Sequence, residues 1–283
     1  MIFILDTCTI NNLLQVDLIS VDEEYELEYD YLDKINHIFT IKFPQKNYDE
    51  LKDTFFKNFS DRNKIKFIRN YMNRNIHSYV YPINSDDFNS SLNFIKRICP
   101  KYKDENNGEL HSTAYALYLN RYENSLTFQT YFITDDDEAI YDFRDIFRSN
   151  FLGEIFTTID LLLILNIYEI ISYKNVMDFA HNLKKQYIKN YNDLLNEIQT
   201  LQKSQPLPKE SSFLTKLYEN INNLDFDKVK TDIESPLYNS IKKKQKNIDT
   251  LLKNILKDDF KKVEILDKQI EEIKSKYWTM DKI

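Results

Sequence analysis

The chain has 283 residues, of which 42% are hydrophobic and 29% are charged, so its composition is that of an ordinary globular protein and excludes overall disorder. Asp and Glu (45) outnumber Lys and Arg (38), which gives a formal net charge of −7. At ~150 residues per domain, this length predicts about two domains.

The scarcity of glycine, cysteine and histidine excludes several kinds of site. The only glycines are Gly108 and Gly153, so a glycine-rich phosphate loop of the Rossmann or Walker type cannot exist. The 2 cysteines and 4 histidines show neither a disulfide framework nor the spacing of a zinc site. The N-terminus lacks the features of a signal peptide, and the most apolar run, at 161–168, is far shorter than the ~20 residues that cross a bilayer. We therefore expect a cytoplasmic protein that does not bind membranes.

In the first half of the chain, short apolar runs alternate with helical patterns. Continuous apolar runs at 2–5 and 130–133 are typical of buried, parallel strands. The segment 17–33 contains many acids and no Lys or Arg, which predicts a solvated insertion or a lid. Strands alternating with helices predict βαβ units and a mostly parallel sheet. Further strands are predicted at 37–41 and 78–81, and helices after residue 6, after Pro44, at 63–74, at 86–98 and from Gly108.

From about residue 159 onward the pattern is helical throughout. The proline-containing segment 205–208 interrupts this pattern. We therefore predict a first domain at 1–190 and a helical region at 191–283, with a linker at about 203–211.

Two features of the helical region suggest partners. Apolar residues at 263–277 keep a spacing of three or four, as in a helical hairpin or short coiled coil, so this stretch is predicted to fold back on the body, to bind a protein partner or to self-associate. Lysines are densest near residue 244 and are weak candidates for phosphate contacts, although a solvated helix face explains them more simply. These lysines are Lys242, Lys243, Lys244 and Lys246.

Acidic residues stand at several points where a strand ends or a helix begins. Asp6 follows the first strand, Glu50 lies in the helix after the second, Glu109 lies in the first turn of another helix, and Asp136 follows the strand at 130–133. Because the carboxyl ends of parallel strands share one edge of a sheet, these side chains can converge there. Clustered carboxylates need a counter-charge, and oxygen ligands of this kind suit Mg²⁺ or Mn²⁺.

Four segments, in order, resemble the motifs of PIN-domain nucleases. Residues 2–7 (Ile-Phe-Ile-Leu-Asp-Thr) resemble the opening strand with its first acid, and residues 43–51 resemble the second-acid segment, with Asn47 in place of the usual apolar residue. Residues 108–114 resemble the "GE" helix start, with His111 where a further acid is common, and residues 133–139 resemble the final "T-x-D" segment.

The PIN resemblance covers about residues 1–190 and implies an α/β/α sandwich followed by a helical extension. It implies a metal-dependent endonuclease that uses one or two Mg²⁺ or Mn²⁺ ions and acts most often on RNA, with many relatives among toxins or host-defence effectors. Asp6, Glu50, Glu109 and Asp136 would be the catalytic acids and metal ligands. Supporting roles fall to Asp135, which could also ligate the metal, and to Thr7, Thr134 and Asp137.

Each acid also has a structural explanation. Asp6 could cap the following helix, Glu50 and Asp137 fit capping boxes, and Glu109 favours a helix dipole. A non-catalytic, nuclease-like subunit of an RNA-processing or defence complex, acting through the C-terminal helices, is the alternative function. A phosphatase of the haloacid-dehalogenase type is disfavoured, because its second Asp is replaced by Cys8.

Overall fold

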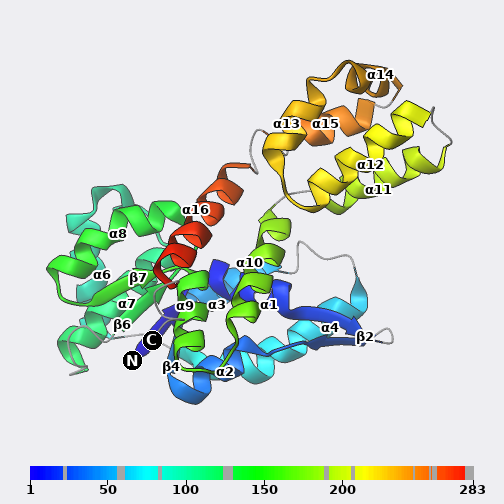
Figure 1. The fold of residues 1–283 in the computed structure, drawn as a ribbon. Helices are drawn as coiled ribbons and strands as arrows, with labels where there is room; N and C mark the ends of the chain where they lie inside the picture. Colours follow the sequence, from blue (N-terminus) through cyan, green and yellow to red (C-terminus); the bar gives the residue numbers. More distant parts are fainter. Residues whose placement is uncertain are drawn as a thin grey trace. The chain divides into compact units, whose positions relative to one another are not determined.

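The computed structural model describes residues 1–21, 24–55, 61–81, 85–123, 130–187, 191–204, 208–244, 246–254, 256 and 260–277. The chain, drawn in Figure 1, forms two compact units, Met1–Val176 and Met177–Ile283. Each unit has its own hydrophobic core. The boundary predicted after residue 190 adjoins residues 188–190, which lie outside the described part of the chain.

The first unit contains a five-stranded parallel sheet. Its strand order is β5 (Val80–Tyr81), β4 (Thr40–Pro44), β1 (Ile2–Leu5), β6 (Thr130–Ile133) and β7 (Gly153–Phe156). β1 and β6 are nearly continuous apolar runs because helices cover both faces of the sheet. The α/β class and the parallel sheet expected from the sequence are thus confirmed.

Successive residues of the central strands point to opposite faces of this sheet. Ile4 and its neighbour Phe132 belong to the core formed with α6 (Asp86–Ile98), α7 (Gly108–Tyr122) and α8 (Asp137–Ser149). On the other face, the ring of Phe3 packs edge-on against that of Phe39 at 4.8 Å between centroids, at the end of α2. The remaining helices of this unit are α1 (Thr7–Asp17), α2 (Tyr31–Ile38), α3 (Gln45–Phe55), α4 (Arg62–Tyr71), α5 (His77–Tyr79) and α9 (Thr158–Ile167).

The structure differs from the sequence-based elements in four places. The strand predicted at 37–41 begins only at Thr40, because the preceding residues complete the amphipathic helix α2, which Asp30 caps. The strand predicted at 78–81 is reduced to its last two residues, since 77–79 form a helical turn. Strand β7 was not predicted. The acidic segment 17–33 contains an antiparallel hairpin of β2 (Leu18–Val21) and β3 (Glu24–Leu27).

The second unit is helical in its described residues. Its apolar core includes Leu194, Leu214, Val229 and Ile248. A buried polar contact lies beside this core, where Asp232 accepts hydrogen bonds from Lys216 at 2.7 Å and from Asn220 at 2.6 Å. Its helices are α10 (Tyr173–Tyr187), which spans the boundary between the units, α11 (Tyr191–Lys203), α12 (Pro208–Asn222), α13 (Phe226–Ile233), α14 (Pro236–Lys244), α15 (Lys246–Asn254) and α16 (Phe260–Tyr277).

The predicted lysine cluster falls at the junction of α14 and α15. Lys242 lies 3.5 Å from Asp249, so its charge is partly balanced within the unit. The side chains of Lys243, Lys244 and Lys246 lie outside the described part of the structure.

Candidate active site

The candidate site lies between β1 and β6, where the strand order of the sheet changes direction. β1 is flanked by β4 on one side and by β6 on the other, and the chain reaches β6 only after it has completed β4 and β5. Such a reversal opens a crevice at the carboxyl ends of the two central strands, where open α/β sheets bind ligands. Asp6 follows β1 and Thr134 follows β6, and the backbone amide of Asp6 donates to the carbonyl of Ile133 at 2.9 Å.

Asp6 is the most thoroughly bonded acid of the site. Its side chain is buried, and Oδ1 accepts hydrogen bonds from the backbone amide of Thr7 at 2.7 Å and from Nδ2 of Asn47 at 3.0 Å. Oδ2 accepts from Oγ1 of Thr134 at 2.8 Å and from Sγ of Cys8 at 3.2 Å. Burial nevertheless outweighs these donors and raises the pKa of the Asp6 carboxyl.

Glu50 approaches the site because residue 108 has no side chain. A Cβ atom on Gly108 would lie 2.6 Å from Oε2 of Glu50 and 2.8 Å from Nδ2 of Asn47, which is too close for either contact. Burial raises the pKa of Glu50, and the charge of Asp6 adds to this, whereas Lys46 and the backbone amide of Gly108 lower it. The glycine of the "GE" motif is therefore also required for packing, because only glycine leaves room for Glu50 and Asn47.

Glu109 carries the clearest sign of a carboxylate cluster. Burial is the largest cause that raises its pKa, the charges of Asp6, Asp136 and Glu50 also raise it in that order of importance, and together these effects bring it to about 7. Its Oε2 atom is buried and has no hydrogen-bond partner. The structure thus brings the four predicted acids near enough to perturb one another, although they come from four separate segments of the chain.

Asp136 and Asp137 lie at the exposed rim of this cluster. Asp136 caps α8, with Oδ1 accepting from the backbone amides of Glu138 at 2.8 Å and Ala139 at 3.1 Å. Its own amide donates to Oγ1 of Thr134 at 3.2 Å. Asp137 is the first residue of that helix. Asp136 is therefore the cap of α8, a role that the sequence analysis did not predict for it, and this role coexists with an electrostatic effect on Glu109.

Asp135 is held by a different set of partners. Oδ1 accepts from the backbone amide of Thr158 at 2.8 Å, and Oδ2 accepts from Oγ1 of Thr158 at 2.5 Å and from Nδ2 of Asn12 at 2.6 Å. These contacts connect the end of β6 to α1 and to the start of α9. Asp135 thereby fixes the loop that carries Asp136 and Thr134.

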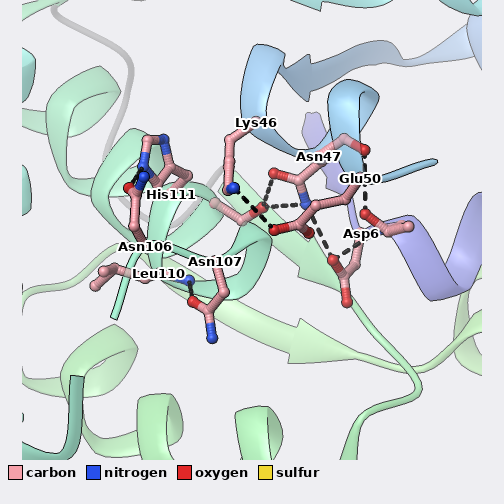
Figure 2. A network of polar contacts seen from close by, with 10 residues as sticks. Asp6, Lys46, Asn47, Glu50, Asn106, Asn107, Leu110 and His111 are labelled. Carbon is pink, nitrogen blue, oxygen red and sulfur yellow. Dashed lines mark hydrogen bonds and ion pairs between the residues drawn. The ribbon is translucent and has the colours of Figure 1, made fainter. Parts of the chain in front are cut away.

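Asn47 is a functional candidate that the sequence analysis noted only because it replaces the usual apolar residue of the second-acid motif. It is fully buried, it donates to Asp6, and it also donates from Nδ2 to Oγ of Ser112 at 3.2 Å (Figure 2). Its backbone carbonyl accepts from Oγ1 of Thr7 at 3.2 Å. Asn47 lies four residues before the buried Leu51 and so on the same face of α3, which was the available signal that this polar side chain points inward.

Cys8 is the second residue whose contribution was not predicted. Its sulfur contacts Asp6, and it accepts a hydrogen bond from the backbone amide of Asp135 at 3.2 Å. Burial, with the charges of Asp6 and Asp135, holds the pKa of the thiol well above its usual value. Cys8 is therefore a protonated, weak donor to the first acid.

The donor chemistry of the cluster suits a hard divalent ion, but the side chains are not arranged around one. All four acids offer oxygen, and Oε2 of Glu109 is a buried atom without a partner. Among the described residues, however, no group of three or more His, Cys, Asp or Glu side chains stands in position to hold an ion. The residues thus fit a metal in kind, with side-chain adjustment needed to ligate it.

Comparisons with protein-family models, with curated proteins and with solved structures gave no match. The relation to PIN domains therefore stays a prediction from the four motif segments. In the described part of the chain, no helix combines the length and the apolar character required to span a membrane.

Proposed function

We propose that the chain is a metal-dependent endonuclease that hydrolyses phosphodiester bonds, with RNA as the substrate class that the motif resemblance favours. The observation that carries the proposal is the environment of Glu109. Three acids from other segments raise the pKa of this carboxyl, and one of its oxygens is buried without a partner. Carboxylates gathered at a strand switch point repel one another and oppose folding, and an ion-binding role accounts for their presence.

In this proposal, Asp6, Glu50, Glu109 and Asp136 hold one or two Mg²⁺ or Mn²⁺ ions. A bound ion of this kind lowers the pKa of a water molecule and stabilises charge on the phosphate. Thr134 orients the carboxylate of Asp6 by donating to Oδ2 at 2.8 Å. Because its pKa is raised to about 7, Glu109 is partly protonated near neutral pH when no cation is present.

Positioning roles go to residues that hold these acids without reaching the substrate. Asn47 fixes the other oxygen of Asp6, and Gly108 leaves room for Glu50 while its amide stabilises that carboxylate. Asp135 acts in the same way by tying its loop to Thr158. We assign Asp135 this role in preference to metal ligation, because its three hydrogen bonds come from α1 and from the start of α9, whereas Asp6 is bonded to residues that hold the other acids.

Substitution of the first acid tests the proposal. We expect the purified wild-type chain to cut single-stranded RNA with Mg²⁺ or Mn²⁺ and not with EDTA, and Asp6→Asn to lose this activity. Asn suits this position structurally: its Oδ1 can accept from Thr7 and Asn47, while its Nδ2 faces Thr134 and Cys8, both of which can accept.

The matched control is Asp17→Asn, which removes another buried carboxylate from the opposite end of the same helix, α1. Total RNA and single- and double-stranded DNA should be incubated with each protein, and thermal melts should accompany every assay. Full activity in a folded Asp6→Asn protein would refute the mechanism.

A non-catalytic, nuclease-like subunit is the second candidate, and the bonding of Asp6 favours it. Each Asp6 oxygen already accepts two hydrogen bonds, which occupies the positions that a metal would use. Such a subunit would act through its helical unit, which has a core of its own. Calorimetric titration with Mn²⁺ separates the two functions: saturable binding that Asp6→Asn weakens supports the nuclease, and no binding supports the subunit.

A further inference from the structure

Lys46 is a cation placed directly beside the carboxylate cluster. It lies on the first turn of α3, and its Nζ atom is 3.5 Å from Oε1 of Glu50 (Figure 2). The side chains of Lys46 and Glu50 are 31% and 29% exposed, so the pair is neither free in solvent nor sealed in the core. The charge of Lys46 lowers the pKa of Glu50 and so stabilises the ionised carboxylate.

A second lysine, Lys96, acts on the same neighbouring histidine as Lys46. His111, one turn into α7, feels the charges of both Lys46 and Lys96. Its Nε2 atom lies 2.7 Å from Oδ1 of Asn106 and is thus anchored to the loop that precedes the helix (Figure 2). Lys46 and Lys96, from different helices, therefore both act on His111, and Lys46 also pairs with Glu50 of the cluster.

A lysine beside a carboxylate cluster matches the two charged components that a phosphodiesterase binds, a metal ion and a phosphate backbone. A divalent ion belongs with the acids, and the anionic backbone of the strand belongs with the lysines. Lys46 forms an ion pair with a predicted metal ligand, Glu50. When an ion binds Glu50, its positive charge weakens the attraction between Glu50 and Lys46.

We propose that Lys46 exchanges partners: it balances Glu50 while the cluster holds no ion, and it contacts a backbone phosphate of single-stranded nucleic acid once the ion and the strand are bound. This inference rests on the proposed nuclease function and names the residue that couples ion binding to strand binding. The exchange has a low energetic cost, since partly exposed ion pairs of this kind contribute little to stability.

The test compares Lys46→Gln with Lys52→Gln. Lys52 lies on the same helix but pairs with Asp49 at 2.8 Å and covers the ring of Tyr48 at 4.6 Å, on the exposed side of α3. Binding of a nuclease-resistant phosphorothioate single strand is measured with Mn²⁺ at several salt concentrations. Mn²⁺ affinity is measured separately by calorimetry without the strand.

We expect Lys46→Gln to reduce the slope of log affinity against log salt by about 0.7, the value for one phosphate contact on a single strand. Without the competing lysine, Mn²⁺ should bind about 1.5- to 5-fold more tightly, the change that corresponds to one ordinary surface ion pair. Lys52→Gln should leave the Mn²⁺ affinity and the salt slope unchanged. Lys46→Arg should restore the salt slope.

Equal behaviour of Lys46→Gln and Lys52→Gln in both measurements would overturn the inference. That failure is distinguishable from failure of the nuclease proposal. If the wild-type chain cuts RNA while Lys46→Gln behaves like the control, only the exchange is wrong. If the wild-type chain binds neither Mn²⁺ nor the strand, the nuclease proposal is wrong and the exchange falls with it.

Discussion

Replacing Glu109 by Gln should stabilise the protein when no metal is present. The substitution keeps the size of the side chain and removes its charge from a position where burial and three other acids raise its pKa. Below pH 4.5 the carboxyl is protonated in the folded and unfolded states alike, so the substitution has little effect there. Between pH 4.5 and about 7 the folded wild-type chain holds a proton that the unfolded chain releases, so wild-type stability falls as the pH rises through this window.

The size of the gain follows from the pKa of Glu109. A rise from the usual 4.5 to about 7 corresponds to roughly 3.5 kcal/mol at ~1.4 kcal/mol per pH unit, as an upper bound. Glu109 is only partly buried, and screening by solvent reduces this bound to roughly 1–2 kcal/mol. Above pH 7 the stabilisation by Glu109→Gln should be complete and constant.

Urea unfolding at pH 4.5, 6 and 8 in EDTA measures this effect. The matched control is Asp87→Asn, which removes an exposed acid from the same position of another helix: Asp87 is two residues beyond the cap Ser85, as Glu109 is beyond Asn107. The control should lose a small amount of stability, because acids favour a helix N-terminus. If Glu109→Gln is also destabilising at pH 8, the helix dipole explains Glu109 and the reasoning about a carboxylate cluster is refuted.

Three further outcomes are expected. Gly108→Ala should displace Glu50, whose Oε2 would lie 2.6 Å from the new Cβ, and should lower Mn²⁺ affinity roughly tenfold in calorimetry with unchanged circular dichroism. Asn47→Leu should destabilise the chain in urea by about 1.5–3 kcal/mol at pH 8, because the buried Asp6 loses a donor, and by less in acid, where Asp6 is protonated. Apparent Mn²⁺ affinity should fall roughly tenfold per pH unit below about 7, since Glu109 must lose its proton to ligate the ion; a pH-independent affinity would contradict this.

The sequence predicted those elements whose signal is local. β1 and β6 are uninterrupted apolar runs, and α6 and α7 begin behind the capping residues Ser85 and Asn107, so their positions could be predicted closely. Strand β7 has no such signal, because it begins with a glycine and an acid and so contains no continuous apolar run. Only the structure explains that glycine: Gly153 has φ 137°, and a Cβ atom there would lie 1.9 Å from the carbonyl oxygen of Thr130 on the neighbouring strand.

The acidic residues of the candidate site could be predicted from the sequence, whereas the residues that position them could not. Carboxylates that follow parallel strands must share one edge of the sheet, so the order of segments was sufficient to expect their approach. Asn47, Cys8 and Gly108 act through contacts between residues far apart in the chain, such as the 3.0 Å hydrogen bond from Asn47 to Asp6. A pattern of residue types cannot supply such contacts, because they depend on how α3 packs against α1 and α7.

The unequal hydrogen bonding of Asp6 and Glu109 indicates how the proposed nuclease reduces the repulsion between its carboxylates when no ion is bound. Asp6 is held by four donors, which compensate its charge from within the protein. Glu109 has a buried oxygen with no donor, so its charge is compensated by a proton near neutral pH. Of the donors to Asp6, the thiol of Cys8 is the weakest and is the one that an ion would displace at least cost. In this arrangement an ion would replace the proton of Glu109 and the weak hydrogen bond from Cys8 to Asp6. Ion affinity would therefore depend on pH because of Glu109, and ion binding would require the Cys8 side chain to rotate away from Asp6.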